Sequence, residues 1–218
     1  MTSAEFRDRL LARVGRAGGL ISRQALEALE SYFILLARWS TTVNLTALPL
    51  DPPRDETFDR LFVEPIVAAD HLLPAADVMP FAPVWFDLGS GGGSPAIPLK
   101  IMRPNWALTM VEARERKAAF LREAARTLRL SKTEVANVRF EDLLQSGTQA
   151  DLVTVRAVKV DAALRAVSTS LLRESGRLAL FGVAQDSLPG FDLVQTVELN
   201  SSSVLTVLSR VPRGTKQG

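Results

Sequence analysis

A glycine-rich segment near the middle of the chain carries the residue types that bind a nucleotide-like ligand. It follows the apolar run 84–88, which contains Asp87, and its glycines at 89, 91 and 93 form a G-x-G-x-G pattern. Where a buried strand passes into a helix, the free backbone N–H groups of such a turn can hold an anionic group. A dinucleotide fingerprint has its third glycine where this chain has Ser94. The spacing therefore favours S-adenosylmethionine over NAD.

We expect four residues of this segment to lie against the cofactor. Gly89 and Gly91 let the backbone approach a ligand without obstruction by a Cβ atom, and Ser90 lies between them. Asp87 can order the cofactor's ammonium group, directly or through water. A tight turn with a purely structural role is the alternative.

Polar residues also stand at the ends of the next two predicted strands. Glu112 ends the strand 107–112, where a carboxylate can accept hydrogen bonds from both ribose hydroxyls of a nucleoside. The alternative is an ordinary exposed acid at a strand end. Phe140 and Glu141 follow the strand 135–139, where they can read an adenine edge or simply start the next turn.

Arg156 ends the strand 151–156, at the edge of the sheet where substrates bind. We predict that it positions the substrate, as the catalytic residue of the site. The alternative is a salt bridge to Glu141 or Asp87. The chain has no cysteine and one histidine, His71, which argues against a hydrolytic triad, and no metal is expected.

Strands and helices alternate from residue 84 onwards, which predicts a mostly parallel sheet with helices on both faces. The expected strands are 84–88, 107–112, 135–139, 151–156, 177–183, 191–199 and 203–210, and the expected helices are 95–102, 114–130 and 160–173. The last two strands are joined by Asn200–Ser202, which suits an antiparallel hairpin at the sheet edge. The expected fold class is α/β, because seven strands with a terminal hairpin resemble the Rossmann-like methyltransferase fold that binds S-adenosylmethionine.

The first third of the chain predicts helices instead. They are expected at 3–17, 22–40 and 56–73, with Ser22 as an N-cap. Prolines at 74, 80 and 83 mark a linker. We therefore predict a helical extension over residues 1–80 and a cofactor-binding methyltransferase domain over residues 81–218.

Composition sets the broad class. The chain has 218 residues and is 47% hydrophobic, enough for a sizeable core. Neither a signal peptide nor an apolar run of membrane-spanning length is evident, so a cytoplasmic protein is expected. The net charge is only +2, but basic residues gather in the first 23 residues and between Arg114 and Lys132. Both groups can meet phosphates or form solvated helix faces.

Several motifs resemble the ribosomal RNA small-subunit methyltransferase G family, also called glucose-inhibited division protein B. The resemblance runs from about residue 26 to residue 183. The matching segments are Trp39 with Val43-Asn44-Leu45-Thr46, the loop 87–99, Arg103-Pro104, Val111-Glu112-Ala113, Arg116-Lys117 with Phe120-Leu121, and Arg156-Ala157.

The resemblance implies a fold, a cofactor and a substrate. It implies S-adenosylmethionine as cofactor and methylation of ring nitrogen seven of a guanine in 16S rRNA, with free 16S rRNA or the small ribosomal subunit as the partner. It implies cofactor contacts at Gly89, Ser94, Phe140, Glu141 and Arg156. The sequence predicts no membrane partner and leaves the oligomeric state open.

The chain departs from the family pattern at a few positions, some of which we expect to face RNA. Leu61, Glu64 and Pro65 stand where the family has a histidine and an Asp-Ser pair, and Phe181 stands where it has a lysine. Two alternatives therefore stay open: a methyltransferase of the same fold acting on a small molecule or protein, and a non-catalytic RNA-binding factor of ribosome assembly. An NAD dehydrogenase is the least favoured.

Overall fold

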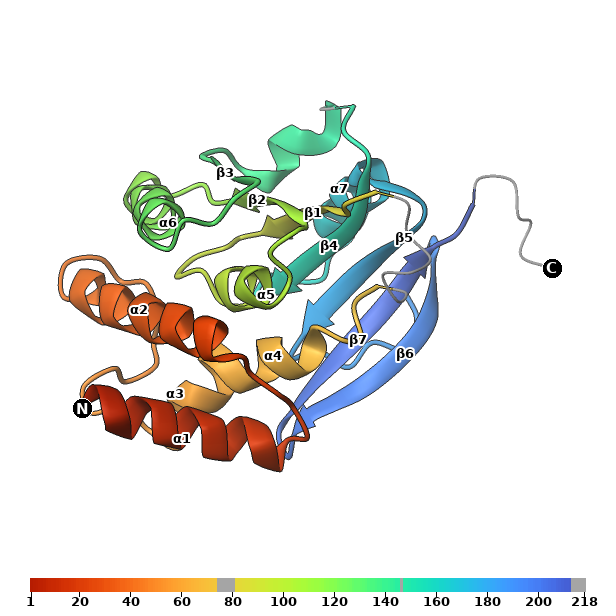
Figure 1. The fold of residues 1–218 in the computed structure, drawn as a ribbon. Helices are drawn as coiled ribbons and strands as arrows, with labels where there is room; N and C mark the ends of the chain where they lie inside the picture. The colour runs from red at the N-terminus through yellow and green to blue at the C-terminus, as the bar shows by residue number, and fades with distance from the viewer. Residues whose placement is uncertain (74–80, 146, 213–218) are drawn as a thin grey trace.

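A central β-sheet organises the molecule (Figure 1). The computed structural model describes residues 1–73, 81–145 and 147–212, and within them the sheet has seven strands. The strands are β1 (Val84–Leu88), β2 (Ala107–Val111), β3 (Thr133–Ala136), β4 (Ala150–Arg156), β5 (Leu172–Phe181), β6 (Phe191–Asn200) and β7 (Ser203–Arg210). Their order is β3-β2-β1-β4-β5-β7-β6. Five strands are parallel, and β7 runs antiparallel between β5 and β6. The predicted fold class and terminal hairpin are thus confirmed.

Burial explains why the central strands read as continuous apolar runs. Four of the five residues of β1 and six of the seven residues of β4 are buried, as expected for strands covered on both faces. In contrast, β6 lies at the edge and exposes much of its length. Two strands differ from their predicted ranges by more than one residue. β3 begins and ends earlier than 135–139, and β5 begins at Leu172 rather than at 177, with a register shift opposite β4.

Helices cover both faces of the sheet, and each face has its own hydrophobic cluster. One face carries α7 (Ala162–Leu171) and the 3-10 helix η3 (Phe140–Gln145). The other carries α5 (Ala96–Met102), α6 (Glu115–Thr127) and the N-terminal helices. Trp85 is fully buried in this second cluster, and Trp39 and Trp106 pack against it, so all three tryptophans contribute to the core.

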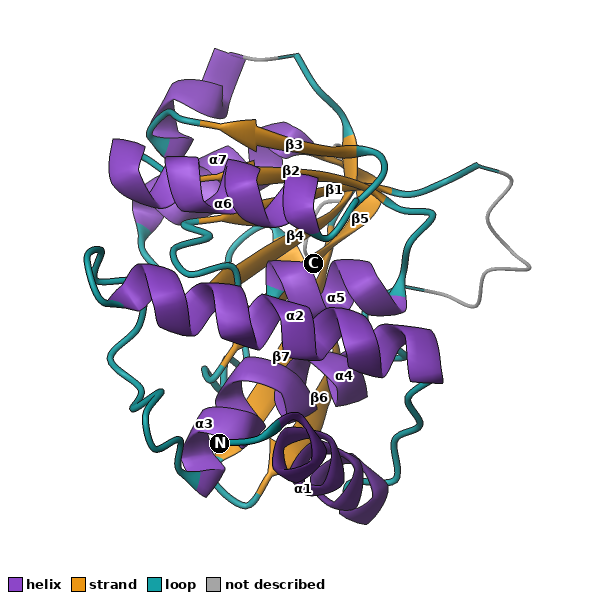
Figure 2. Cartoon of the chain, turned by 60° about the vertical axis from the view of Figure 1, so that its left-hand side comes forward, coloured by secondary structure: helices purple, strands orange, loops and turns teal. Residues whose placement is uncertain are grey.

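The N-terminal segment folds into a layer of helices against the sheet (Figure 2). These are α1 (Ser3–Arg16), α2 (Arg23–Ser40), α3 (Asp55–Phe58), the π-helical turn η1 (Asp59–Val63) and α4 (Glu64–Ala68). Ser22 caps α2 as predicted, because its hydroxyl accepts a hydrogen bond from the Ala25 N–H.

The predicted single helix 56–73 is wrong in two respects. It is interrupted by η1 and ends at Ala68. His71 therefore lies in the turn that follows, where its carbonyl accepts a hydrogen bond from Gln195. The predicted linker prolines at 74 and 80 lie outside the described residues. The division at residue 80 stays a prediction, and the larger hydrophobic cluster contains residues from both sides of it. None of the described helices combines the length and apolar character that crossing a bilayer requires.

Candidate active site

The glycine segment forms a tight loop between β1 and α5, at the carboxyl ends of the parallel strands. The N–H groups of Gly89 and Ser90 both donate to the carbonyl of Val111, at 2.9 and 3.0 Å, so the loop turns over the end of β2. Gly89, Gly91 and Gly93 have φ values of +74°, +53° and +91°. Residues with a Cβ rarely adopt such angles, and this explains the glycine spacing.

Glu112 follows β2 and lies against this loop. Its two carboxylate oxygens accept hydrogen bonds from the N–H groups of Gly91, at 2.9 Å, and Arg114, at 2.8 Å. The residue is 8% exposed, so the alternative of an exposed strand-end acid is wrong. Each carboxylate oxygen retains a further lone pair, which a ribose hydroxyl can use. Asn137, which the sequence did not single out, fixes this strand end by donating to the Glu112 carbonyl at 2.9 Å.

Asp87 lies beneath the loop and is 1% exposed. Thr154 of β4 donates to its carboxylate at 2.5 Å, and the Trp85 indole N–H donates to the same hydroxyl at 2.8 Å. Burial raises the pKa of Asp87 to about 6, although the hydrogen bonds from Thr154 and Ser90 and the charge of Arg156 lower it. Asp87 is thus placed to act on a ligand through its charge.

Phe140 and Glu141 open η3, four and five residues after β3 ends. Phe140 packs against the hydrophobic cluster on the α7 face of the sheet, and Glu141 is exposed. Both roles that the sequence left open, adenine contact and turn formation, remain compatible with this placement.

Arg156 occupies the end of β4 and is anchored by protein atoms. Its guanidinium donates to Glu64 at 2.7 Å, to Ser94 at 3.2 Å and to the carbonyl of Arg60. It also stacks over Phe181, with Cζ 4.8 Å from the ring centre. Burial lowers its pKa to about 10, against the opposing charge of Glu64.

The partner of Arg156 differs from the sequence-based alternatives. The alternative to substrate positioning is a salt bridge to Glu141 or Asp87, whereas the structure pairs Arg156 with Glu64, which lies 92 residues earlier. The Glu64 side chain is 3% exposed and also accepts a hydrogen bond from Asn200, at 2.9 Å. The hairpin turn between β6 and β7 therefore contacts the same network.

The π-helical turn supplies the carbonyls that Arg156 and Ser94 bind. The N–H of Glu64 donates to Asp59, one residue further back than in an α-helix, and Pro65 has no N–H to donate. The carbonyls of residues 60 and 61 consequently lose their α-helical donors. The Ser94 hydroxyl lies 3.3 and 3.1 Å from these two oxygens. Ser94 was expected to contact the cofactor, and here its hydroxyl is directed at the N-terminal helices.

The expectation that some departures from the family pattern face RNA is wrong for the residues in question. Leu61, Glu64 and Phe181 are 5%, 2% and 2% exposed, and Pro65 is also buried. Glu64 accepts a hydrogen bond from Arg156, and the Leu61 carbonyl accepts one from Ser94 of the glycine segment. Their positions bear on how the loop is supported rather than on surface recognition.

The two basic regions of the sequence behave differently. The N-terminal arginines Arg7, Arg9, Arg13 and Arg23 form ion pairs within the helical layer. In contrast, Arg114 and Arg116 are exposed at the start of α6, beside Glu112. Within residues 1–73, 81–145 and 147–212, Arg114 and Arg116 make no ion pair.

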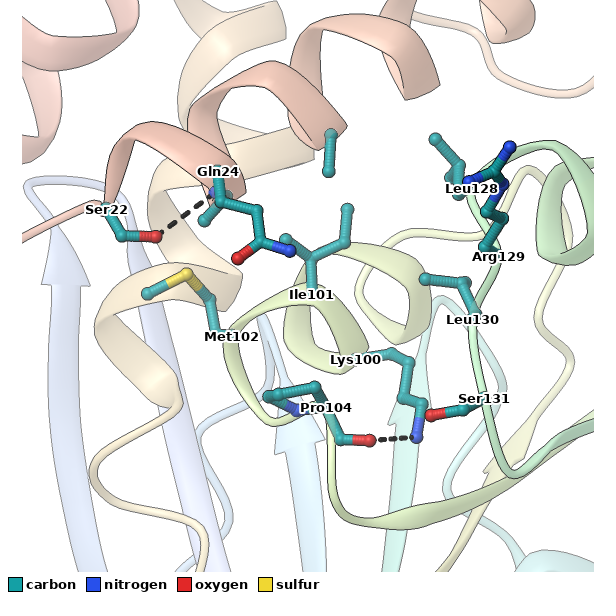
Figure 3. A pocket seen from close by; sticks show the side chains of 12 residues that line it. Ser22, Gln24, Lys100, Ile101, Met102, Pro104, Leu128, Arg129, Leu130 and Ser131 are labelled. Atoms are coloured by element: carbon teal, nitrogen blue, oxygen red, sulfur yellow. Dashed lines mark hydrogen bonds between the residues drawn. The ribbon is translucent and has the colours of Figure 1, made fainter.

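A pocket of about 440 Å³ lies elsewhere, between the N-terminal end of α2 and the segments that follow α5 and α6 (Figure 3). These segments lead into β2 and β3, so the pocket is at the amino ends of the strands, opposite the glycine loop. Its buried Lys100 donates to the carbonyls of Pro104, at 2.9 Å, and Trp106, and burial lowers its pKa to about 8. Lys100 thereby ties down the loop between α5 and β2.

Comparison with known proteins identifies the family. The family model described as rRNA small subunit methyltransferase G matches residues 25–187. The chain belongs to this family. Ribosomal RNA small subunit methyltransferase G of Neisseria gonorrhoeae is 37% identical over 175 residues, which cover 79% of this chain and 77% of the relative. The protein of the same name from Xanthomonas axonopodis is 37% identical over 171 residues, covering 75% and 74% of the two chains.

Solved structures agree with the fold. A crystal structure of a mutant of MtNAS has a TM-score of 0.57 with 14% identity, covering 87% of this chain and 76% of that chain. At this identity the likeness concerns the fold alone. Membership of the rRNA small subunit methyltransferase G family confirms the predicted enzyme class and its cofactor, S-adenosylmethionine. The roles of individual site residues stay predictions.

Proposed function

We propose that the chain transfers the methyl group of S-adenosylmethionine to ring nitrogen seven of a guanine in 16S rRNA, either free or within the small ribosomal subunit. The observation that carries the proposal is the carboxylate of Glu112 hydrogen-bonded to the Gly91 N–H at the carboxyl end of the sheet. An acid and a glycine loop in this arrangement suit a nucleoside with an amino-acid tail. This substrate places the protein in the cytoplasm.

The residues around the loop fit the cofactor by their chemistry. Glu112 retains acceptor capacity for the ribose hydroxyls, and the backbone of residues 89–91 is free of side chains larger than Ser90. The buried charge of Asp87 favours a cationic ligand nearby. When bound, the cofactor supplies an activated methyl group on a sulfonium.

The reaction does not require a strong general base from the protein. Nitrogen seven of guanine carries a free lone pair, so it forms the new N–C bond while the C–S bond breaks and the electron pair stays on sulfur. The products are a cationic 7-methylguanine and the neutral thioether S-adenosylhomocysteine. Catalysis then depends on alignment and on stabilising the new positive charge. We propose that Arg156 contributes by holding the loop through Ser94, since its guanidinium donates to the Ser94 hydroxyl at 3.2 Å.

The start of α6 is the proposed contact for RNA phosphates. Arg114, Arg116 and Lys117 surround the first turn of this helix. The helix dipole disfavours cations there, so helix stability does not account for them. An unpaired guanine splayed out of the RNA can reach the cofactor at this edge.

Methyl transfer to purified ribosomal components tests the proposal. The protein is incubated with methyl-labelled S-adenosylmethionine and free 16S rRNA, intact small subunits, or a mixture of small metabolites, and the rRNA nucleosides are analysed by mass spectrometry. We expect 7-methylguanosine with wild type and at least a tenfold loss with Glu112→Gln. Label in metabolites alone, or rRNA binding without turnover at saturating cofactor, would refute it.

A further inference from the structure

Tyr32 of α2 reaches the glycine loop from the N-terminal layer of helices. It is fully buried, and its hydroxyl donates to the carbonyl of Gly92 at 2.6 Å, across 60 residues of sequence. The helix that carries it runs beside α5 (Figure 2), which continues from the loop. The N-terminal layer thus touches the loop directly.

The packing around Gly92 leaves the loop little freedom on this side. A Cβ atom at Gly92 would lie 2.8 Å from the backbone oxygen of Leu45 and 3.4 Å from Leu36 Cδ1. Contacts of 2.8 Å are essentially never seen for real Cβ atoms. Glycine is therefore required at this position by the N-terminal layer rather than by the backbone angle.

The hydrogen bond from Tyr32 completes the fixing of one peptide plane. In the peptide between Gly92 and Gly93, the carbonyl accepts from Tyr32 and the N–H donates to the carbonyl of Ser90, at 2.7 Å. Both ends of this peptide are thus bound. Burial raises the pKa of Tyr32 far above its ordinary value, so the hydroxyl remains a donor throughout the physiological pH range.

We propose that Tyr32 is a positioning residue for cofactor binding: it sets the orientation of the 92–93 peptide and, through it, the backbone N–H groups of the glycine loop. The inference rests on the proposed function, because it assumes that this loop binds the cofactor. Tyr32 is fully buried and reaches the loop through the Gly92 carbonyl. Its contribution is to preorganise the loop, so its loss weakens binding while the fold persists.

The test compares two buried hydroxyls in the same helical layer. Tyr32→Phe removes the hydroxyl that holds the loop. Thr57→Val is the control. Thr57 is fully buried, donates to the carbonyl of Pro49 at 2.8 Å and accepts from the N–H of Arg54, and neither partner belongs to the glycine loop. Calorimetry measures the Kd for S-adenosylmethionine and S-adenosylhomocysteine, and thermal unfolding measures the stability of each protein.

We expect Tyr32→Phe to raise both Kd values about fivefold, the size typical of one lost hydrogen bond, and Thr57→Val to leave them within twofold of wild type. Both variants should lower the melting temperature. If Glu112→Gln weakens binding while Tyr32→Phe does not, the cofactor site stands and the positioning role is refuted. Equal weakening by Thr57→Val would also refute it, since a general loss of stability would then explain the effect. A wild-type protein that binds neither compound would overturn the proposed function and this inference together.

Discussion

Replacing Arg156 with methionine tests how much the buried ion pair between Arg156 and Glu64 contributes to stability and to cofactor binding. The Arg156 and Glu64 side chains are 12% and 3% exposed, so solvent screens the pair weakly. Removing the guanidinium leaves the Glu64 carboxylate with the hydrogen bond from Asn200. Loss of one partner of a buried pair costs about 3–5 kcal/mol, because the other charge stays desolvated.

The companion variant Glu64→Gln separates the charge from the packing. Glutamine still offers Asn200 a carbonyl acceptor but carries no charge. In the double variant, Arg156→Met with Glu64→Gln, no uncompensated charge remains, so the loss of stability should be smaller than the sum of the two single losses by about 1–3 kcal/mol. The lowered pKa of Arg156, about 10, has the same origin, since it means that burial outweighs the attraction of Glu64.

Urea unfolding at neutral pH measures the four proteins, with the m-values checked for agreement before the free energies of unfolding are compared. Calorimetry with S-adenosylmethionine then tests the role in the site. Because Arg156 holds Ser94 of the loop, we expect cofactor affinity and activity to fall together in Arg156→Met. A loss below 1 kcal/mol, or additive effects in the double variant, would refute the buried-pair argument. Unchanged cofactor affinity with lost activity would restore the sequence-based view that Arg156 contacts the substrate.

Three other outcomes follow from the structure. Burial raises the pKa of Asp87 to about 6, so ionising this carboxyl group lowers the stability of the folded protein as the pH rises from about 4 to 6. The free energy of unfolding of Asp87→Asn, measured by urea titration, should therefore rise relative to wild type by up to about 3 kcal/mol between pH 4 and pH 7. A difference that stays constant with pH would contradict this. Gly92→Ala should weaken cofactor binding and lower the melting temperature, because the new Cβ meets a backbone oxygen at 2.8 Å; calorimetry matching wild type would count against it. Arg116→Ala should reduce RNA affinity and lower the magnitude of the slope of log affinity against log salt by about 1. Arg126 pairs with Glu123, so the control Arg126→Ala should change this slope less. Filter binding over a series of salt concentrations measures both variants.

The order of strands and helices was predictable because burial on both faces gives β1 and β4 continuous apolar runs. The carboxyl ends of parallel strands meet at one edge, so the proximity of Glu112 to the glycine loop was predictable as well. The break in the helix before residue 73 was not predicted, although Pro65 carried a signal: a proline inside a helix removes a backbone donor. Because Pro65 has no N–H, the carbonyl of Leu61 is free to accept a hydrogen bond from Ser94.

The long-range polar contacts could not be read from the sequence for a different reason. Glu64 and Arg156 are 92 residues apart, and many carboxylates in the chain have the same chemistry as Glu64. Burial distinguishes it, and burial of a charged residue depends on how the helical layer docks on the sheet. The same holds for Tyr32, whose apolar neighbours in α2 predict a core position but not the hydroxyl's partner.

The departures at Glu64 and Pro65 are better understood from their surroundings than from the pattern they break. Glu64 keeps the acid of the family pattern, and Pro65 beside it has no N–H. Both residues are buried. The acid holds Arg156, and the missing N–H frees the Leu61 carbonyl for Ser94. Both departures therefore connect the N-terminal helices to the glycine loop. We expect substitutions at these two positions to change the affinity for the cofactor more than the choice of the methylated nucleotide.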